Sequence, residues 1–323
     1  VTTGTLLQTI ANPNDYDTPV QDNFGSAVSI SGEYIVIGAY GEDDANGTSS
    51  GKAYIFKGSA SSPVSQWTVN LSNVSYDSVS FNVDSQESRP RSILFNADGT
   101  KMYVGGATTD SVQQYTLSTG FDIGTASYDS VSFSVASQST TPEAFTINND
   151  GTKMYMLGGS TMYQYSFSTA FDVSTLSYDS VNFSASGQDA VPAAPAFNND
   201  GTKLYIIGGI NRTLYQYSLS TAFNLSTASY DNVSFALSST AGNLNALIFN
   251  TDGTKMYIIG GSNIYQYTLS TGFDVSTASY DNVSFSTSSQ DSDAKALQFS
   301  ADGTKMYIAG DSLNVLYQYS TGL

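Results

Sequence analysis

The sequence predicts an all-β fold, a closed β-propeller of six blades with four antiparallel strands in each blade. The tetrapeptide Asp-Gly-Thr-Lys begins at residues 98, 150, 200, 252 and 302, so one unit recurs along the chain. Short apolar runs alternate with Gly- and Asn-rich turns inside each unit, and no helical periodicity appears. A period of about fifty residues built from short strands is typical of propellers and solenoids.

Each downstream unit contains four strand-like segments. The first is a short apolar run, as at 92–96, and an Asp-Gly turn joins it to the second, as at 101–106. Asp-Gly between two apolar runs favours a hairpin because both residues tolerate positive φ. The third segment carries a Tyr-Gln-Tyr motif, as at 163–165, and the fourth alternates polar and apolar residues, as at 127–133. The recurring tyrosines favour packing between blades over a platform for sugars.

The N-terminal region supplies a further blade of different sequence. Its strand-like segments are Asn-Phe-Gly-Ser-Ala-Val at 23–28, Ile-Gly-Ala-Tyr at 37–40 and Gly-Lys-Ala-Tyr-Ile-Phe at 51–56. These segments resemble the integrin-type FG-GAP repeat, which is itself a propeller blade, with Tyr40 in place of the proline. The resemblance covers about one blade.

A count of strands predicts how the ring closes. The first three strands of a blade occur six times, but a fourth strand follows only five times, and residues 3–10 are left over at the N-terminus. An N-terminal strand that completes the last blade removes exposed edges. The prediction is a single domain with blades at 24–83, 92–135, 144–185, 194–237, 246–287 and 296–323, the last closed by 3–10.

Composition excludes several classes of function. The formal net charge of -17, with only 11 lysines and arginines, opposes binding to nucleic acid or to an anionic membrane. No apolar stretch is long enough for a transmembrane helix. Cysteine and histidine are both absent, which excludes disulfides, thiolate nucleophiles, Cys or His metal sites and a Ser-His-Asp triad. Carboxylate chemistry and an oxygen-ligated metal remain open.

An acidic loop at 41–47 offers oxygen ligands for Ca²⁺. Some FG-GAP blades bind Ca²⁺ through a loop whose acids alternate with other residues, whereas the acids here are consecutive. A charged turn is the alternative, and no other cofactor is predicted. The candidate ligands are Glu42, Asp43, Asp44 and Asn46.

Binding residues are expected on one face of the propeller. The loops between second and third strands and the loops between blades share a face, and their sequences differ from copy to copy, while the opposite loops are nearly uniform. Solvated loops without function are the alternative, and Asp291 with Asp293 could also serve acid–base chemistry, as paired carboxylates do in glycosidases. The candidate ligand-binding residues are Arg89, Arg91, Glu143, Asp189, Arg212, Asn243, Asn245, Asp291, Asp293 and Lys295.

The downstream unit resembles repeats in virion and tail proteins of marine phages, cyanophages especially, and in proteins of marine bacteria. It runs from Asp-Gly-Thr-Lys-Met-Tyr through Tyr-Gln-Tyr to Ser-Thr-Ala-Ser-Tyr-Asp. This resemblance implies a non-enzymatic module on the virion surface or outside the cell, within a larger assembly. Its expected partners are host surface polysaccharide or neighbouring virion proteins. The alternatives are a secreted bacterial adhesin or surface-fibre subunit, and a polysaccharide-degrading propeller enzyme that uses loop carboxylates.

Overall fold

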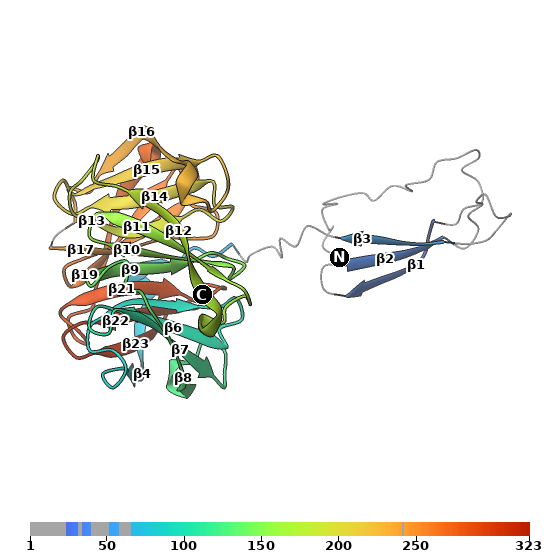
Figure 1. The fold of residues 1–323 in the computed structure, drawn as a ribbon, viewed down its shortest axis with the longest axis horizontal. Helices are drawn as coiled ribbons and strands as arrows, with labels where there is room; N and C mark the ends of the chain where they lie inside the picture. The colour runs from blue at the N-terminus through green and yellow to red at the C-terminus, as the bar shows by residue number, and fades with distance from the viewer. Residues whose placement is uncertain (1–23, 32–33, 40–51, 58–65, 241) are drawn as a thin grey trace. The chain divides into compact units, whose positions relative to one another are not determined.

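The computed structural model describes residues 24–31, 34–39, 52–57, 66–240 and 242–323 (Figure 1). The chain divides into two compact units, residues 1–63 and 64–323. The first unit contains an antiparallel three-stranded sheet in the order β1-β2-β3. Its strands are β1 (Phe24–Ser31), β2 (Tyr34–Ala39) and β3 (Lys52–Lys57).

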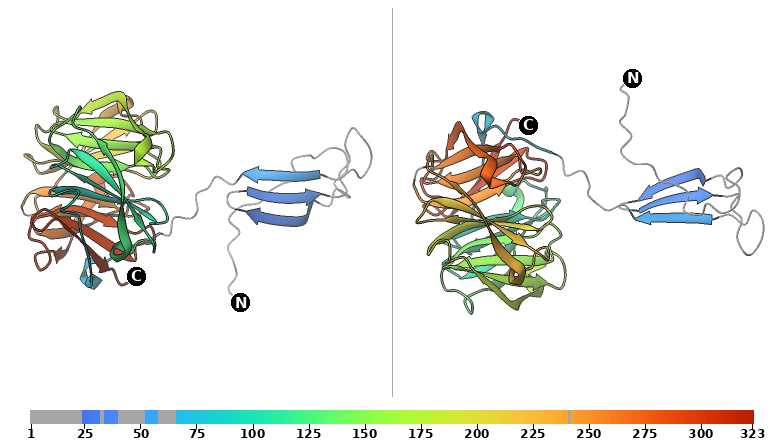
Figure 2. Two further views of the ribbon diagram at one scale, coloured as in Figure 1. Left: turned by 60° about the horizontal axis from the view of Figure 1, so that its bottom comes forward. Right: turned by 90° about the horizontal axis from the view of Figure 1, so that it is seen from above.

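The second unit is a β-propeller of five blades, each a four-stranded antiparallel sheet (Figure 2). The first strands of the blades contact one another in the cyclic order β5, β9, β13, β17, β21 and back to β5, so the ring is closed. The strands of the first two blades are β5 (Pro90–Phe95), β6 (Lys101–Gly106), β7 (Ser111–Leu117), β8 (Ala126–Ser134), β9 (Pro142–Ile147), β10 (Lys153–Gly158), β11 (Thr161–Phe167) and β12 (Leu176–Ser184). Those of the third and fourth blades are β13 (Pro192–Phe197), β14 (Lys203–Gly208), β15 (Thr213–Leu219), β16 (Ala228–Ala236), β17 (Leu244–Phe249), β18 (Lys255–Gly260), β19 (Asn263–Leu269) and β20 (Ala278–Ser286).

The fifth blade joins the two ends of the propeller sequence. Its strands are β21 (Ala294–Phe299), β22 (Lys305–Gly310), β23 (Val315–Ser320) and, as the fourth, β4 (Ser75–Asn82). Strand β4 pairs with β23 in an antiparallel register that sets Tyr76 opposite Tyr319. The ring is therefore closed by a strand from the beginning of the propeller.

The predicted number of six blades is wrong, and so is the predicted closing strand. Strand β4 was expected to complete the FG-GAP-like blade at 24–83, but it completes the last blade instead. Residues 3–10, the expected closing strand, lie outside the described residues. The physical reason is the chemistry of β4. Its Asp77 bonds Lys305 at 2.7 Å, as the Asp of every other fourth strand bonds the Lys of its own blade.

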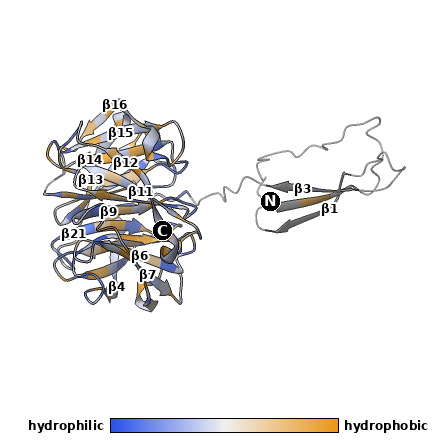
Figure 3. Cartoon of the chain, viewed as in Figure 1, coloured by the Kyte–Doolittle hydropathy of each residue, from blue (hydrophilic) through white to orange (hydrophobic). Residues whose placement is uncertain are grey.

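The core lies between neighbouring blades. One cluster, for example, combines Tyr205 and Ile207 of the third blade with Met256 and Tyr267 of the fourth. In Figure 3 the hydrophobic stretches lie mainly along the blade strands. Ten tyrosines are almost completely buried, and the side chain of Phe133 meets Tyr165 of the next blade edge-on. The expectation that the repeated tyrosines pack between blades is confirmed.

Two sets of hydrogen bonds run around the ring from blade to blade. A tyrosine hydroxyl of each second strand donates to a backbone carbonyl of the next blade, as Tyr103 does to Phe171 at 2.7 Å. A glutamine of each third strand accepts from a backbone N–H of the blade after it, as Gln114 does from Val173 at 2.9 Å. The glutamine acceptors are Gln114, Gln164, Gln216, Gln266 and Gln318. Within the described residues, no helix is long and apolar enough to span a membrane.

Candidate ligand-binding site

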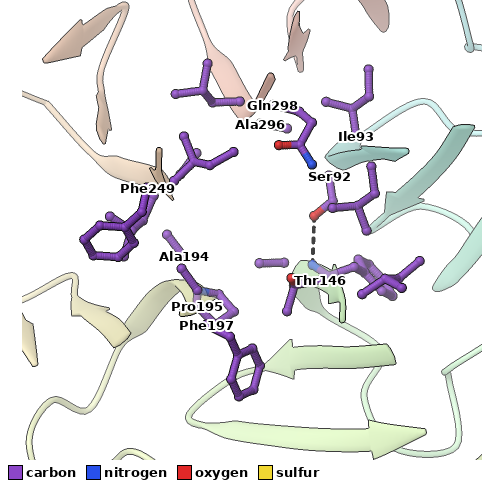
Figure 4. Close-up of a pocket in the computed structure, with 18 of the residues that line it drawn as sticks. Ser92, Ile93, Thr146, Ala194, Pro195, Phe197, Phe249, Ala296 and Gln298 are labelled. Atoms are coloured by element: carbon purple, nitrogen blue, oxygen red, sulfur yellow. Dashed lines mark hydrogen bonds between the residues drawn. The ribbon is translucent and has the colours of Figure 1, made fainter. Parts of the chain in front are cut away.

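A cavity of about 230 Å³ lies on the axis of the propeller and is lined mainly by the first strands of all five blades. Figure 4 shows Ser92, Thr146, Ala194, Phe249 and Gln298 around it. The Oγ of Ser92 accepts a hydrogen bond from the Phe145 N–H at 2.8 Å, which ties β5 to β9. Most of the lining side chains are apolar, but polar atoms contribute more of the exposed wall, so polar contacts decide what the cavity can bind.

One end of the cavity opens on the predicted binding face. Backbone hydrogen bonds join the two loop types there, for example from Asp311 N–H to Asp293 O at 3.0 Å. We call this side the loop face. The second residue of each first strand lies at this end and differs in every blade. These residues are Arg91, Glu143, Ala193, Asn245 and Lys295.

Three of the predicted site residues line the cavity: Arg91, Asn245 and Lys295. We call their end of the cavity the channel mouth. The amide of Asn245 donates to the carbonyl of Ala294 at 3.0 Å, so it also bridges the fourth and fifth blades. Glu143 occupies the equivalent position on β9 and its side chain is exposed.

The lysine and aspartate that recur in every blade form an ion pair with each other within that blade. Lys101 bonds Asp129 at 2.7 Å, and the same carboxylate accepts from Thr116 and Gln114. Burial by itself raises the pKa of Asp129, but these hydrogen bonds and the charge of Lys101 outweigh it and hold the pKa below its usual value. The equivalent pairs are Lys153–Asp179, Lys203–Asp231, Lys255–Asp281 and Lys305–Asp77.

Two predicted binding carboxylates hold loops in place. Asp189 is buried and accepts from the backbone N–H groups of Val191 and Asn211, both at 2.8 Å. Asp291 is buried and accepts from the N–H groups of Asp293 at 2.7 Å and Leu313 at 3.2 Å. Their acceptor oxygens therefore face the backbone of their own blades.

Glu87 does the same in the first blade and was not singled out from the sequence. It is fully buried and accepts from the N–H groups of Thr108 at 3.0 Å and Thr109 at 3.1 Å. The signal that could have found it is its position. Each of these acids lies five residues after the last residue of a fourth strand: Glu87 after β4, Asp189 after β12 and Asp291 after β20.

Two further predicted residues, Arg212 and Asn243, lie where loops meet. The guanidinium of Arg212 donates to the carbonyls of Thr240 and Gly242, both at 2.6 Å, and so ties the third blade to the loop before β17. Asn243 is exposed, and its carbonyl accepts from the Gly261 N–H at 2.9 Å.

Three cations and two carboxylates gather at the junction of the fifth and first blades. The Arg91 Nη1 lies 3.6 Å from Asp311 Oδ2, and the Arg89 Nε lies 3.9 Å from the same oxygen. The Lys295 Nζ donates to Asp293 Oδ1 at 2.6 Å. Asp311 was not predicted from the sequence.

The predicted calcium ligands Glu42, Asp43, Asp44 and Asn46 lie outside the described residues. Among the residues that are described, no group of three or more carboxylates is placed to hold a metal ion. The calcium site stays a prediction.

Comparison with known proteins identifies one repeat. Residues 14–56 match the FG-GAP repeat family. No curated protein matches the chain. Distant structural similarity links it to a functionally unknown protein from Desulfotomaculum acetoxidans, with 12% identity, a TM-score of 0.44 and coverage of 88% of this chain and 74% of that one.

Two other solved structures are similarly distant. One is a candidate 6-phosphogluconolactonase from Bacteroides uniformis, with 12% identity, a TM-score of 0.42 and coverage of 80% of this chain and 70% of that one. The other is a luciferin-regenerating enzyme, with 11% identity, a TM-score of 0.45 and coverage of 75% of this chain and 94% of that one.

Proposed function

We propose that this chain is a non-enzymatic structural or adhesion module on the surface of a virion or in its tail. The loop face binds a host surface glycan or a neighbouring virion protein. A β-propeller with an FG-GAP repeat fits such a module. The resemblance of the downstream repeats to those of marine phage proteins supports the location.

The observation that carries this proposal is that the repeated residues stabilise the fold, whereas the residues that vary between blades lie on one face. The repeated Asp, Lys, Gln and Tyr side chains bond to one another within or between blades. The residues that differ between blades gather at the channel mouth and on the loop face, where Val191, Ile210 and Leu313 are 57%, 62% and 57% exposed. A rigid ring whose five blades carry different loop residues on one face is suited to recognition of a ligand.

Binding is favoured over catalysis by the state of the loop carboxylates. A general acid or base must reach a proton of the substrate. Asp189 and Asp291 already accept backbone N–H groups, and Asp293 pairs with Lys295. Incubation with host polysaccharide is therefore expected to yield no new reducing or unsaturated ends, and their appearance would contradict this part of the proposal.

A face-blocking experiment tests where binding occurs. The chain has no cysteine, so single variants Ile210→Cys on the loop face and Ser118→Cys on the opposite face can each be coupled to one polyethylene glycol maleimide. Both side chains are exposed. Retention on host cells or on a glycan array is expected to be lost with the first conjugate and kept with the second. Equal retention by both conjugates contradicts the use of the loop face.

A further inference from the structure

Nine lysines and arginines fall within residues 66–323, and six of them are used by the scaffold. Five pair with the repeated aspartates, and Arg212 donates to backbone carbonyls. The other three, Arg89, Arg91 and Lys295, lie at the junction of the fifth and first blades. Among the cations of residues 66–323, those that the scaffold does not use therefore all lie beside the channel mouth.

These charges do not belong to the repeat. The residue after the second strand is Ala107, Gly159, Gly209 or Gly261 in the first four blades, and only the fifth blade has a carboxylate there, Asp311. The position of Arg91 and Lys295 is likewise uncharged in the third and fourth blades. The junction is therefore chemically distinct from the equivalent places around the ring.

The junction also leaves one hydrogen-bond donor and one acceptor without partners. The side chain of Arg91 is only 10% exposed, and its distance of 3.6 Å to Asp311 is longer than a hydrogen bond. Among the described residues, the buried Nε of Arg91 and the buried Oδ1 of Asp311 both lack a hydrogen-bond partner. Both atoms are enclosed by protein, so a ligand does not reach them, but they show that Asp311 does not satisfy the Arg91 guanidinium by a close hydrogen bond.

We infer that the channel mouth binds an acidic sugar, whose carboxylate lies between Arg91 and Lys295. A guanidinium is well suited to a carboxylate. This inference rests on the proposed binding function and names the ligand class that the loop face recognises.

The dimensions and the wall suit a single acidic sugar unit. The cavity of about 230 Å³ is smaller than the ~300 Å³ at which sites for drug-sized molecules begin. Ala296 and Leu297 in its wall offer apolar surface to the C–H face of a sugar ring. Asp293 is 47% exposed, so it stays hydrated when a ligand carboxylate replaces it beside Lys295.

Calorimetric titration of the full chain with three trisaccharides tests the inference. The probes are a galacturonic acid trisaccharide, the neutral galactose trisaccharide and a sulfated galactose trisaccharide. The galacturonic acid probe is expected to bind at least about tenfold more tightly than the neutral one, because a charge-assisted hydrogen bond contributes that much. The sulfated probe is expected to bind more weakly than the carboxylated one, since it lacks the planar carboxylate that the Arg91 fork fits.

Variants locate the site. Arg91→Gln and Lys295→Gln are each expected to weaken binding of the galacturonic acid probe about tenfold or more. Asp311→Asn removes the carboxylate that competes for Arg91 and is expected to keep or strengthen that binding. Ser118→Gln on the opposite face is the control, and it is expected to leave binding unchanged because its exposed side chain lies away from the channel mouth. Thermal melting of each variant separates a lost contact from a lost fold.

Three results would overturn the inference, and each leaves a different account. Unchanged binding in Lys295→Gln overturns the site even if Arg91→Gln fails to fold. Equal binding of the neutral and galacturonic acid probes, or tightest binding of the sulfated probe, overturns the specificity for a sugar carboxylate, while glycan adhesion stands. If no probe binds and the Ile210→Cys conjugate still loses host-cell retention, the acidic-sugar site is wrong and the loop-face function survives.

Discussion

The indole ring of Trp67 packs over Gly303, so a Cβ at that glycine would lie 2.4 Å from the indole Cγ. In the other blades a phenylalanine ring covers the equivalent glycine, as Phe121 covers Gly99. In the repeat alignment, Val69 and not Trp67 stands at the position of these phenylalanines, and Trp67 comes two residues earlier. The carbonyl of Val69 still accepts from the Tyr257 hydroxyl at 2.7 Å, as the phenylalanine carbonyls do in the other blades. The segment that closes the ring thus reproduces the contacts of the repeat with different residues.

A pair of truncations tests the closure. Deletion of residues 1–63 is expected to leave the cooperative melting of the propeller unchanged, because that segment forms its own compact unit. Deletion of residues 1–82 removes β4, exposes the edge of β23 and is expected to abolish cooperative melting and cause aggregation. Circular dichroism and light scattering during heating measure both effects. Identical melting of the two truncations would contradict closure by β4.

Replacement of Trp67 tests the packing at the closing blade. Trp67→Ala removes a side chain that is 6% exposed and packs against Tyr257 and Phe299, so the free energy of unfolding is expected to fall by about 3–5 kcal/mol. Gln66→Ala, at an exposed neighbouring side chain, is the matched control. Urea titration provides the measurement, and a loss below about 1 kcal/mol would mean that the indole contributes little.

Gly303→Ala tests the same contact from the other side. The glycine has a φ of +73°, and a Cβ would overlap the indole, so the single change is expected to destabilise the fold by about 1–3 kcal/mol. In the Trp67→Ala background the overlap with the indole ring disappears, while the Cβ of residue 67, 2.6 Å from the added Cβ, and the backbone strain remain. Urea titration of the single and double variants should therefore show a coupling of about 0.5–3 kcal/mol. Strict additivity would indicate that the two residues do not touch.

Acid is expected to remove the stabilisation that the repeated aspartates provide. Burial raises the pKa of Asp129, but its hydrogen bonds from Lys101, Thr116 and Gln114 lower the pKa by more, so the folded-state pKa is below the usual value. A folded-state pKa below the unfolded value of about 3.9 gives stability that is complete above that value and is lost as the pH falls through the folded pKa. The stability difference between the wild type and Asp129→Asn should therefore be about 1–3 kcal/mol at neutral pH and should shrink below about pH 4. Urea midpoints at several pH values measure it, and a difference that grows in acid would reverse the sign of the prediction.

Alkali is expected to destabilise the propeller through its buried tyrosines. Burial, followed by the negative charge of Asp129, raises the pKa of Tyr103, and burial likewise raises the pKa of Tyr115 and its equivalents. A raised folded-state pKa favours the neutral form, so stability is complete below the unfolded value of about 10 and falls as the pH rises above it. Tyrosinate absorbance of the buried tyrosines should appear together with unfolding measured by circular dichroism. Their ionisation near pH 10 in a folded chain would contradict the assignment.

The repeat predicted the blades because their turns and pairs are local. Asp-Gly turns, alternating strands and the tyrosine motif all act within about fifty residues, so spacing reveals them. The count of blades failed because β4 follows the FG-GAP-like strands in the chain but carries the chemistry of the distant repeats. Its Asp77, matched to Lys305, was the available signal.

The candidate site was predictable only in part. Arg91 and Lys295 stood out as charges in variable loops, and both line the cavity. Whether a loop carboxylate faces solvent or its own backbone depends on tertiary geometry, so Asp189, Asp291 and the missed Glu87 could not be separated by sequence. Asp311 directly follows a strand, and its importance depends on the neighbouring blade that brings Arg91 to it.

The pairing of β4 with β23 has a mechanical consequence. Ser75 lies opposite Ser320 and Asn82 lies opposite Val315, so the chain enters one strand and leaves the other at the same end of the ladder. Tension applied between these two exits would load the hydrogen bonds one after another, in the manner of a zipper, instead of all at once in shear. When the chain is pulled from these two ends, the ring is therefore expected to open first between β4 and β23 of the fifth blade.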